Sequence, residues 1–385
     1  MPEDSVKKKL PNNKRILFLD YARIAACVLV LLVHVSAMWL EREAVGSAGS
    51  FFALSGNILA FVGVSLYVMI SGALVLSPEY KTDVKHCFYK SFRLMGLWFL
   101  WKVIYRLLDM WQFKAAGVSV SWKEDFFLEL FRKPGHYHLW FLPMLAIIYL
   151  MVPLIKKGCE KQENCVLYLM IFVLVSIVFP TLFLFDFPFR YLLEDFYSLF
   201  DLSYFAGYLG YFIMGYFLVA HNDREKSNVF IIIECFFAIA AFAIACVVAG
   251  RRSSVNGVVC ELFSTPFSIH NILLSEAVFL TLKRFVGTGN KTAGTDSDEP
   301  SEKNDGAAEE KRAGFAVSLP AVLSAATLGV YLIHPFILDI MVKAGFMSAI
   351  GNVWIGLPLM LILLALLSFI VAILLRKIPY INKVL

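Results

Sequence analysis

The chain has 385 residues, of which 59% are hydrophobic and 17% charged, and its mean hydropathy is +0.71. Soluble globular proteins have an apolar share of about 45–50%, so this composition excludes a soluble fold. The formal net charge of +5 comes from Lys and Arg spread over short segments, which argues against a nucleic-acid-binding patch. We therefore predict an all-α, polytopic integral membrane protein whose surroundings are a lipid bilayer.

Apolar stretches of membrane-spanning length follow one another along the whole chain. They predict about ten transmembrane helices, at residues 16–40, 51–77, 94–111, 138–155, 165–185, 202–220, 228–250, 267–286, 317–341 and 354–375. An even number of crossings places both termini on one side. If that side is the cytoplasm, the inner segments carry more than twice as many Lys and Arg as the outer ones. The positive-inside rule therefore predicts an N-in/C-in, multi-pass protein of the cytoplasmic membrane.

The first predicted helix carries an acid, a base and an imidazole within an apolar stretch. At about 100° per residue, Asp20, Arg23 and His34 fall on one face. Charged groups inside a membrane are costly and usually face a bundle interior or a wet cavity, so these residues are candidates for function. The alternative is that Asp20 and Arg23 only pair near the cytoplasmic interface while His34 is a structural core histidine.

The second predicted helix has small residues four apart, Gly63 to Ser71-Gly72, a pattern typical of close helix packing. Basic residues follow it at the predicted cytoplasmic mouth. Lys90 and Arg93, three positions apart, could clamp phosphates, although positive-inside bias alone also explains a basic cluster there.

Two later segments place histidines where a lipid-facing helix should have none. His138 and Trp140 lie at the predicted outer interface, where an aromatic belt explains the tryptophan better than the histidine. Tyr331, His334 and Pro335 lie near the end of the ninth predicted helix. The proline frees a backbone carbonyl there, and His334 could either cap it or face a cavity.

The remaining features exclude several other sites. The cysteines form no Cys/His cluster at metal-ligand spacing, so we expect no metal, and only Cys260 lies in a predicted outer loop, so we expect no structural disulfide. Residues 287–312 are rich in small and charged residues and predict a disordered cytoplasmic loop. Its glycines lack the spacing of a phosphate-binding loop. We otherwise expect a single membrane domain spanning residues 1–385.

These motifs together resemble the acyltransferase family 3 membrane proteins, in order and over nearly the whole chain. The matching elements are Arg23-x10-His34, Ser71-Gly72, Lys90-x-x-Arg93, His138-Leu-Trp-Phe-Leu and Tyr331-Leu-Ile-His334-Pro335. The segment that continues to Tyr149-Leu-Met-Val-Pro153 resembles the branch with the enterobacterial common antigen O-acetyltransferase and the intercellular-adhesin acyltransferases. The chain departs from the family at Lys90, where an arginine is common; lysine lacks the bidentate fork for a phosphate.

The resemblance implies a membrane-bound O-acyltransferase of the bacterial cytoplasmic membrane. Its donor would be cytoplasmic acyl-CoA, commonly acetyl-CoA, used as a substrate rather than a permanently bound cofactor. The acceptor would be a hydroxyl of an envelope polysaccharide or its lipid-linked precursor. Direct transfer and a transient acyl-enzyme both fit these residues. The alternative is a transporter or flippase of glycan intermediates, but the sequence has no internal inverted repeat.

The expected roles follow from chemistry and from the matched motifs. His34 would be the general base, with Arg23 steadying the donor and Asp20 holding Arg23. By resemblance, Arg93, Lys90 and Ser71 would bind the acyl-CoA, and His138, Trp140, Tyr331 and His334 would bind the acceptor.

Overall fold

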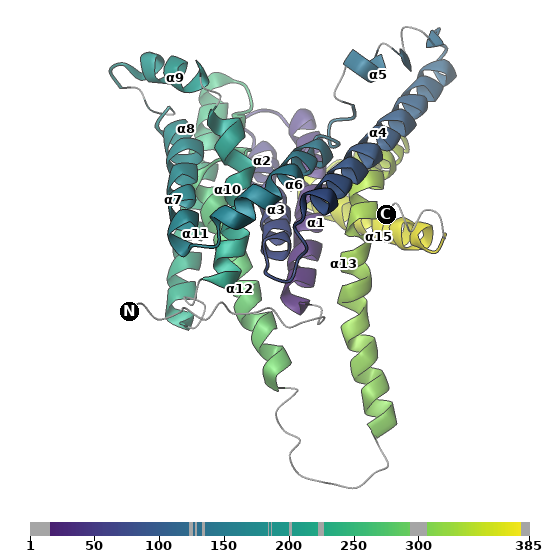
Figure 1. Ribbon diagram of the computed structural model, residues 1–385. Coiled ribbons are helices and arrows are strands. Elements are labelled where there is room, and N and C mark those ends of the chain that lie inside the picture. Colours follow the sequence, from purple (N-terminus) through teal and green to yellow (C-terminus); the bar gives the residue numbers. More distant parts are fainter. Residues whose placement is uncertain are drawn as a thin grey trace, which may run out of the picture. The chain divides into compact units, whose positions relative to one another are not determined.

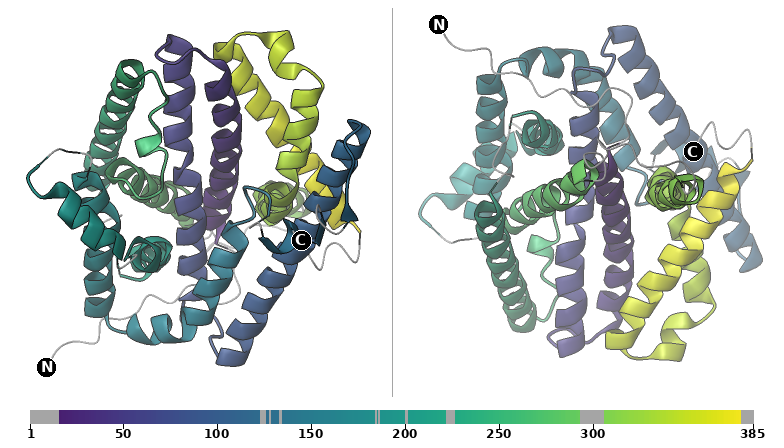
Figure 2. Two further views of the ribbon diagram at one scale, coloured as in Figure 1. Left: turned by 90° about the horizontal axis from the view of Figure 1, so that it is seen from above. Right: turned by 90° about the horizontal axis from the view of Figure 1, so that it is seen from below.

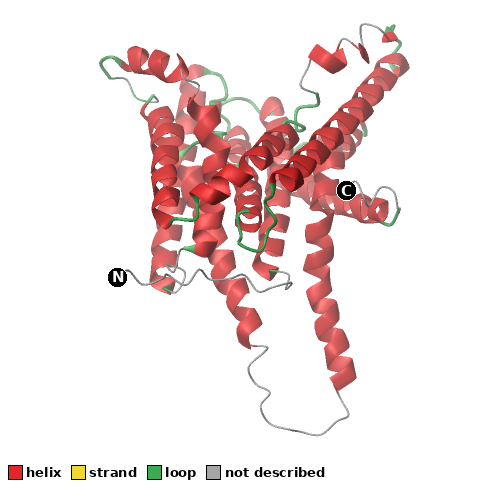
Figure 3. Cartoon of the chain, in the orientation of Figure 1, coloured by secondary structure: helices red, strands yellow, loops and turns green. Residues whose placement is uncertain are grey.

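The computed structural model describes residues 16–122, 126–127, 129–132, 135–183, 185, 187–199, 202–221, 227–292 and 306–378. Within these ranges the chain is helical, with turns and loops between the helices and no strand (Figure 3). This confirms the all-α class. The helices are α1 (Leu17–Arg42), α2 (Ala48–Ala60), α3 (Val62–Val75), α4 (Val84–Ala115), α5 (Glu129–Arg132), α6 (Phe141–Gly158), α7 (Gln162–Phe172), the π-helix η2 (Val173–Val178), α8 (Phe179–Leu182), α9 (Arg190–Leu199), α10 (Leu202–Ala220), α11 (Asn228–Asn256), the 3₁₀-helix η4 (Glu261–Phe263), α12 (Ile269–Thr292), α13 (Gly306–Lys343), α14 (Phe346–Ile350) and α15 (Val353–Arg376).

Every segment predicted to cross the membrane is helical. Among the described residues, 7 helical stretches are long and apolar enough to span a bilayer: 17–42, 48–75, 141–158, 162–182, 228–256, 319–343 and 353–376. The other predicted spans correspond to α4, α10 and α12, which are more polar or shorter. The protein is thus a polytopic membrane protein, and the count of ten remains a prediction.

Several boundaries differ from those expected from hydropathy. α4 begins at Val84, ten residues before the predicted span, because Asp83 caps it by accepting a hydrogen bond from the His86 N–H at 3.1 Å. The basic cluster expected in a loop therefore lies on a helix. Cys87, which falls between two predicted spans, is buried in the first turn of α4.

The helices that flank the predicted cytoplasmic loop extend into it. α12 continues through Thr292, and α13 begins at Gly306 (Figure 1). Residues 293–305, the centre of the predicted disordered segment 287–312, lie outside the described residues.

The chain divides into two compact units, which are described separately. The smaller unit spans residues 78–161 and contains α4, α5 and α6. The larger unit contains α1 to α3 and the helices from α7 onward. In it, α1 lies between the α2–α3 pair and the α13–α15 pair (Figure 2) and contacts α12 as well.

Burial separates the inner and outer helices of the larger unit. In the most apolar part of each span, 67% of the residues of 48–75 are buried, against 22% in α11 and 28% in α15. The exposed residues of α11 and α15 are large and apolar, among them Phe236 and Ile370. We therefore assign α11 and α15 to the lipid-facing periphery and α1 and α3 to the centre, where polar groups avoid lipid.

Glycine permits the closest helix contacts in this centre. A Cβ atom on Gly72 of α3 would meet the backbone carbonyl of Phe212 in α10, and one on Gly215 would meet that of Met69. A Cβ on Gly63 would lie 2.7 Å from the Ala26 carbonyl oxygen of α1. The spacing of small residues in the second predicted span thus serves packing, as the pattern indicates.

Candidate active site

The acid and base of the first helix form an ion pair that reaches a third group. Arg23 Nη1 lies 3.8 Å from Asp20 Oδ1 and donates a hydrogen bond to Ser324 Oγ of α13 at 3.0 Å. Asp20 is only 3% exposed. A buried carboxylate requires a cationic or hydrogen-bonding neighbour, so this pair binds α1 to α13 as well as fixing the guanidinium.

One turn further along α1, three buried groups from three helices meet. The hydroxyl of Tyr67 in α3 interacts with the Cys27 thiol of α1 and with Thr327 of α13, and Arg23 acts on it electrostatically. Thr327 Oγ1 also donates to the Ser324 carbonyl at 2.8 Å. Sequence reasoning missed Ser324, Thr327 and the role of Tyr67, because an isolated hydroxyl in a helix gives no signal until its partners are known.

The two histidines of α1 and α13 lie face to face. The rings of His34 and His334 are stacked, with centroids 5.0 Å apart and planes 28° from parallel. His334 is fully buried, and its Nδ1 lies 3.0 Å from the Val330 carbonyl oxygen. Because a carbonyl only accepts, the Nδ1 atom of His334 carries a proton and donates this bond.

The carbonyl that His334 bonds differs from the one suggested by the sequence. It is that of Val330, and not the carbonyl that Pro335 leaves without its helical donor. The ring also faces His34. Tyr331 lies near it, with ring centroids 6.4 Å apart.

An amide fixes the turn of α1 that carries His34. Asn57 Nδ2 of α2 donates to the Val33 carbonyl and to Ser36 Oγ, both at 3.1 Å. Asn57 and Ser36 are 6% and 0% exposed, so these bonds are formed away from solvent and are expensive to break. They position the backbone on either side of His34.

Polar side chains of α1, α3 and α13 thus form one column, here called the polar column. It comprises Asp20, Arg23, Cys27, His34, Tyr67, Ser324, Thr327 and His334. At 1.5 Å per residue, Arg23 and His34 lie roughly 16 Å apart along α1. This separation equals about half the thickness of a hydrocarbon core of roughly 30 Å.

The expected donor-binding residues belong to both units. Ser71 bonds the Tyr67 carbonyl of its own helix at 2.9 Å. Lys90 and Arg93 lie on α4 in the smaller unit, where Lys90 is half-buried and Arg93 exposed.

In the smaller unit, histidines cluster just before α6. His136 and His138 lie with their Nδ1 atoms 3.0 Å apart, and Tyr105 of α4 stacks on His136 at 4.5 Å between centroids. His138 is buried, whereas Trp140 is 40% exposed, as expected for a residue of an aromatic belt. Sequence reasoning singled out His138 but did not connect it to α4. Among the described residues, no group of His, Cys, Asp and Glu could hold a metal ion.

Comparison with known proteins agrees with this geometry. A family model described as "Acyltransferase domain" matches residues 16–377. No curated protein and no solved structure matches the chain. The match runs from the start of α1 to just past the end of α15 and so includes the whole polar column. The chain therefore belongs to acyltransferase family 3 and is a membrane acyltransferase.

Proposed function

We propose that the protein transfers an acyl group, commonly acetyl, from cytoplasmic acyl-CoA to a hydroxyl of an envelope glycan or its lipid-linked precursor. The observation that carries this proposal is the polar column, in which an oriented guanidinium and two stacked imidazoles lie about three turns apart along α1. Acyl-CoA is too polar to cross lipid. A transferase that acts on outer sugars therefore needs polar groups that continue through the membrane.

At the inner end, the Arg23 guanidinium would steady the donor. Asp20 and Ser324 hold it in place, so the donor meets a cation that is already oriented. Lys90 and Arg93, one turn apart on α4, would bind the phosphates of the coenzyme. Lysine binds as a point charge, so we expect Arg93 to contribute more than Lys90.

At the outer end, His34 would act as general base. The acceptor oxygen attacks the thioester carbonyl carbon, a C–O bond forms and the C–S bond breaks. The hydroxyl proton passes to the His34 imidazole and from there to the leaving thiolate, which gives the ester and free CoA. Imidazole is the side chain best suited to accept and return a proton near neutral pH. His334 would position the His34 ring by stacking, while Tyr331, His138 and Trp140 would contribute to acceptor binding.

We also propose ten crossings, with both termini on the cytoplasmic side of a bacterial cytoplasmic membrane. Arg23 contacts Ser324, and about three turns later on both helices His34 contacts His334, so α1 and α13 run parallel. Parallel spans start on the same side and must be separated by an odd number of crossings. Four strongly apolar spans lie between α1 and α13, at 48–75, 141–158, 162–182 and 228–256. Four is an even number, so at least one further crossing is needed.

The additional crossings follow from contacts of α10 and α12. α12 packs antiparallel to α11, with Arg284 near Asn228 and Thr281 near Cys235. α10 runs beside α12 in the same direction, as two hydrogen bonds show. The Tyr211 hydroxyl donates to the Pro266 carbonyl just before α12, and further along both helices Lys283 donates to the Leu218 carbonyl at 2.6 Å. If α10 and α12 cross the membrane as α11 does, the number of crossings between α1 and α13 is still even. It becomes odd only if α4 crosses the membrane too. This reasoning supports ten spans.

The proposal is tested by incubating the purified protein with labelled acetyl-CoA and an envelope glycan extract. We expect label in the glycan, in an ester that mild alkali releases. The matched control is His270→Ala, which removes another buried histidine, 2% exposed, that lies outside the polar column. A protein that binds glycan intermediates but neither binds acetyl-CoA nor transfers label would be a flippase, and the proposal would be wrong.

A further inference from the structure

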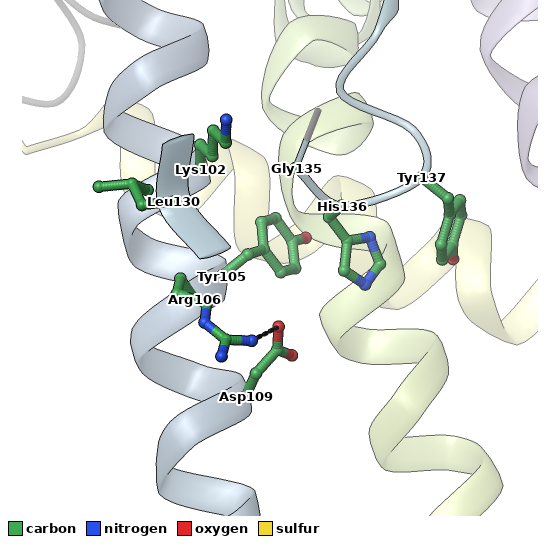
Figure 4. A pocket seen from close by; sticks show the side chains of 8 residues that line it. All are labelled: Lys102, Tyr105, Arg106, Asp109, Leu130, Gly135, His136 and Tyr137. Carbon is green, nitrogen blue, oxygen red and sulfur yellow. Dashed lines mark ion pairs between the residues drawn. The ribbon is translucent and has the colours of Figure 1, made fainter. Parts of the chain in front are cut away.

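A cavity lies within the smaller unit. It has a volume of about 270 Å³ and is formed between one face of α4 and the segment that leads into α6. Lys102, Tyr105, Arg106 and Asp109 line it from α4, with i, i+3, i+4 and i+7 spacing that places them on one helix face (Figure 4). His136 lies opposite, with its ring facing Tyr105.

Lys102 is the unusual member of this cavity. The residue is 6% exposed, and the contact found for its ammonium in the described part of the chain is the face of Trp98, 4.7 Å from the ring centroid. The aliphatic stem of Lys102 packs on Gly135. A Cβ atom on that glycine would lie 3.1 Å from Lys102 Cγ. An ammonium buried against an aromatic face carries a desolvation cost that a bound anion would offset.

The other charges of the cavity leave it positive. Arg106 Nη1 lies 3.9 Å from Asp109 Oδ2, a long ion pair that neutralises one of the two cations. Figure 4 shows this pair at one end of the α4 face and the Lys102 side chain at the other. The excess positive charge therefore lies at the Lys102 end.

We infer that this cavity binds the oxyanion, phosphate or carboxylate, of a negatively charged sugar. Its volume is at the small end of ligand pockets, which suits a single sugar unit and is too small for a coenzyme A molecule. Lys102 binds the oxyanion, and Tyr105 and His136 offer ring faces and polar edges to the sugar. The inference rests on the proposed function and narrows it: the acceptor is an anionic glycan, and this cavity is its recognition site.

Binding of a labelled sugar phosphate tests the inference without any need for acyl transfer. Glucose 1-phosphate is titrated into the full-length protein in detergent, with glucuronic acid, glucose and short-chain phosphatidylglycerol as competitors. Lys102→Met keeps the length of the side chain and removes its charge. Lys114→Met is the matched control, because Lys114 is an exposed lysine in the last turn of the same helix.

We expect saturable binding that glucuronic acid competes for and glucose does not. Lys102→Met should weaken it at least tenfold, and Lys114→Met should leave it unchanged. Lys102→Met should fold, since replacing a buried charge by an apolar group of similar size is neutral or stabilising. The thermal midpoint should rise with glucose 1-phosphate in the wild type and in Lys114→Met, but not in Lys102→Met.

Equal binding by wild type and Lys102→Met would overturn the inference, as would equal competition by glucose. Competition by phosphatidylglycerol alone would assign the cavity to a bilayer lipid and also contradict it. If the sugar phosphate binds as expected while no acyl transfer to any glycan is found, the proposed function fails and the binding site stands.

Discussion

Arg23 and His34 lie on one helix but are proposed to have different roles. Substituting each residue should therefore change a different property of the enzyme. His34→Ala should lower turnover by about 10²–10⁴-fold, the range that general-base removal causes, while acyl-CoA still binds. Rates of glycan labelling, divided by the amount of folded protein, measure this. The matched control His270→Ala measures how much activity is lost when any buried histidine is removed. Full activity per folded molecule in His34→Ala would reject the base assignment and make His334 or His138 the next candidate.

Arg23→Ala should act on binding and folding instead. The substitution removes the 3.8 Å ion pair of Asp20 and leaves a buried carboxylate without that cation, which typically costs about 3–5 kcal/mol. We expect less folded protein and weaker acyl-CoA binding, measured by thermal unfolding and by equilibrium binding.

A double variant separates the two losses. Asp20→Asn combined with Arg23→Ala removes the stranded charge, so stability should recover in part while acyl-CoA binding remains weak. Recovery of binding together with stability would show that Arg23 is only structural.

At the scale of elements, the contact between α3 and α10 is the most sensitive to size. Gly72→Ala would place a methyl group against the Phe212 carbonyl, and such overpacking costs about 1–3 kcal/mol or more. The thermal midpoint should fall. Gly96→Ala in α4 is the matched control, because a Cβ there meets nothing within 4 Å, and its midpoint should not fall. Equal midpoints for the two variants would contradict the close helix contact.

The crossing of α4 is the other prediction at this scale. The native cysteines are poor probes of it, because Cys87 and Cys159 are 1% and 5% exposed. We propose new cysteines at exposed lysines on either side of the predicted span, Lys81→Cys and Lys114→Cys, in a cysteine-free background. A membrane-impermeant maleimide added to intact cells should label position 114 and should label position 81 only after permeabilisation. Labelling of both positions from outside would show that α4 does not cross.

For the whole molecule, the sequence was informative wherever a single helix carries the signal. Hydropathy predicted the 7 strongly apolar spans close to their helical bounds, whereas polar residues extend α4 ten residues ahead of its predicted start. Asp20, Arg23 and His34 were found because charges in an apolar helix are rare enough to stand out.

Contacts between distant segments could not be predicted in the same way. The meeting of His34 with His334, and of Arg23 with Ser324, depends on which helices are neighbours, and one sequence contains no information on helix pairing in a membrane. Lys102 lies within the predicted span 94–111, and that position does not reveal its neighbours in space. Its burial beside Trp98 emerges only when α4 and the segment before α6 are folded together.

The central claim is that the acyl group passes from a donor on one face of the membrane to an acceptor on the other. The most direct measurement uses proteoliposomes sorted for one orientation, with labelled acetyl-CoA supplied on the face that carries the N-terminus and the glycan acceptor enclosed on the opposite face. The account predicts labelled glycan in this arrangement, loss of most label with His34→Ala, and none when the donor is supplied only on the acceptor's side. Labelling only when donor and acceptor share one face would contradict it.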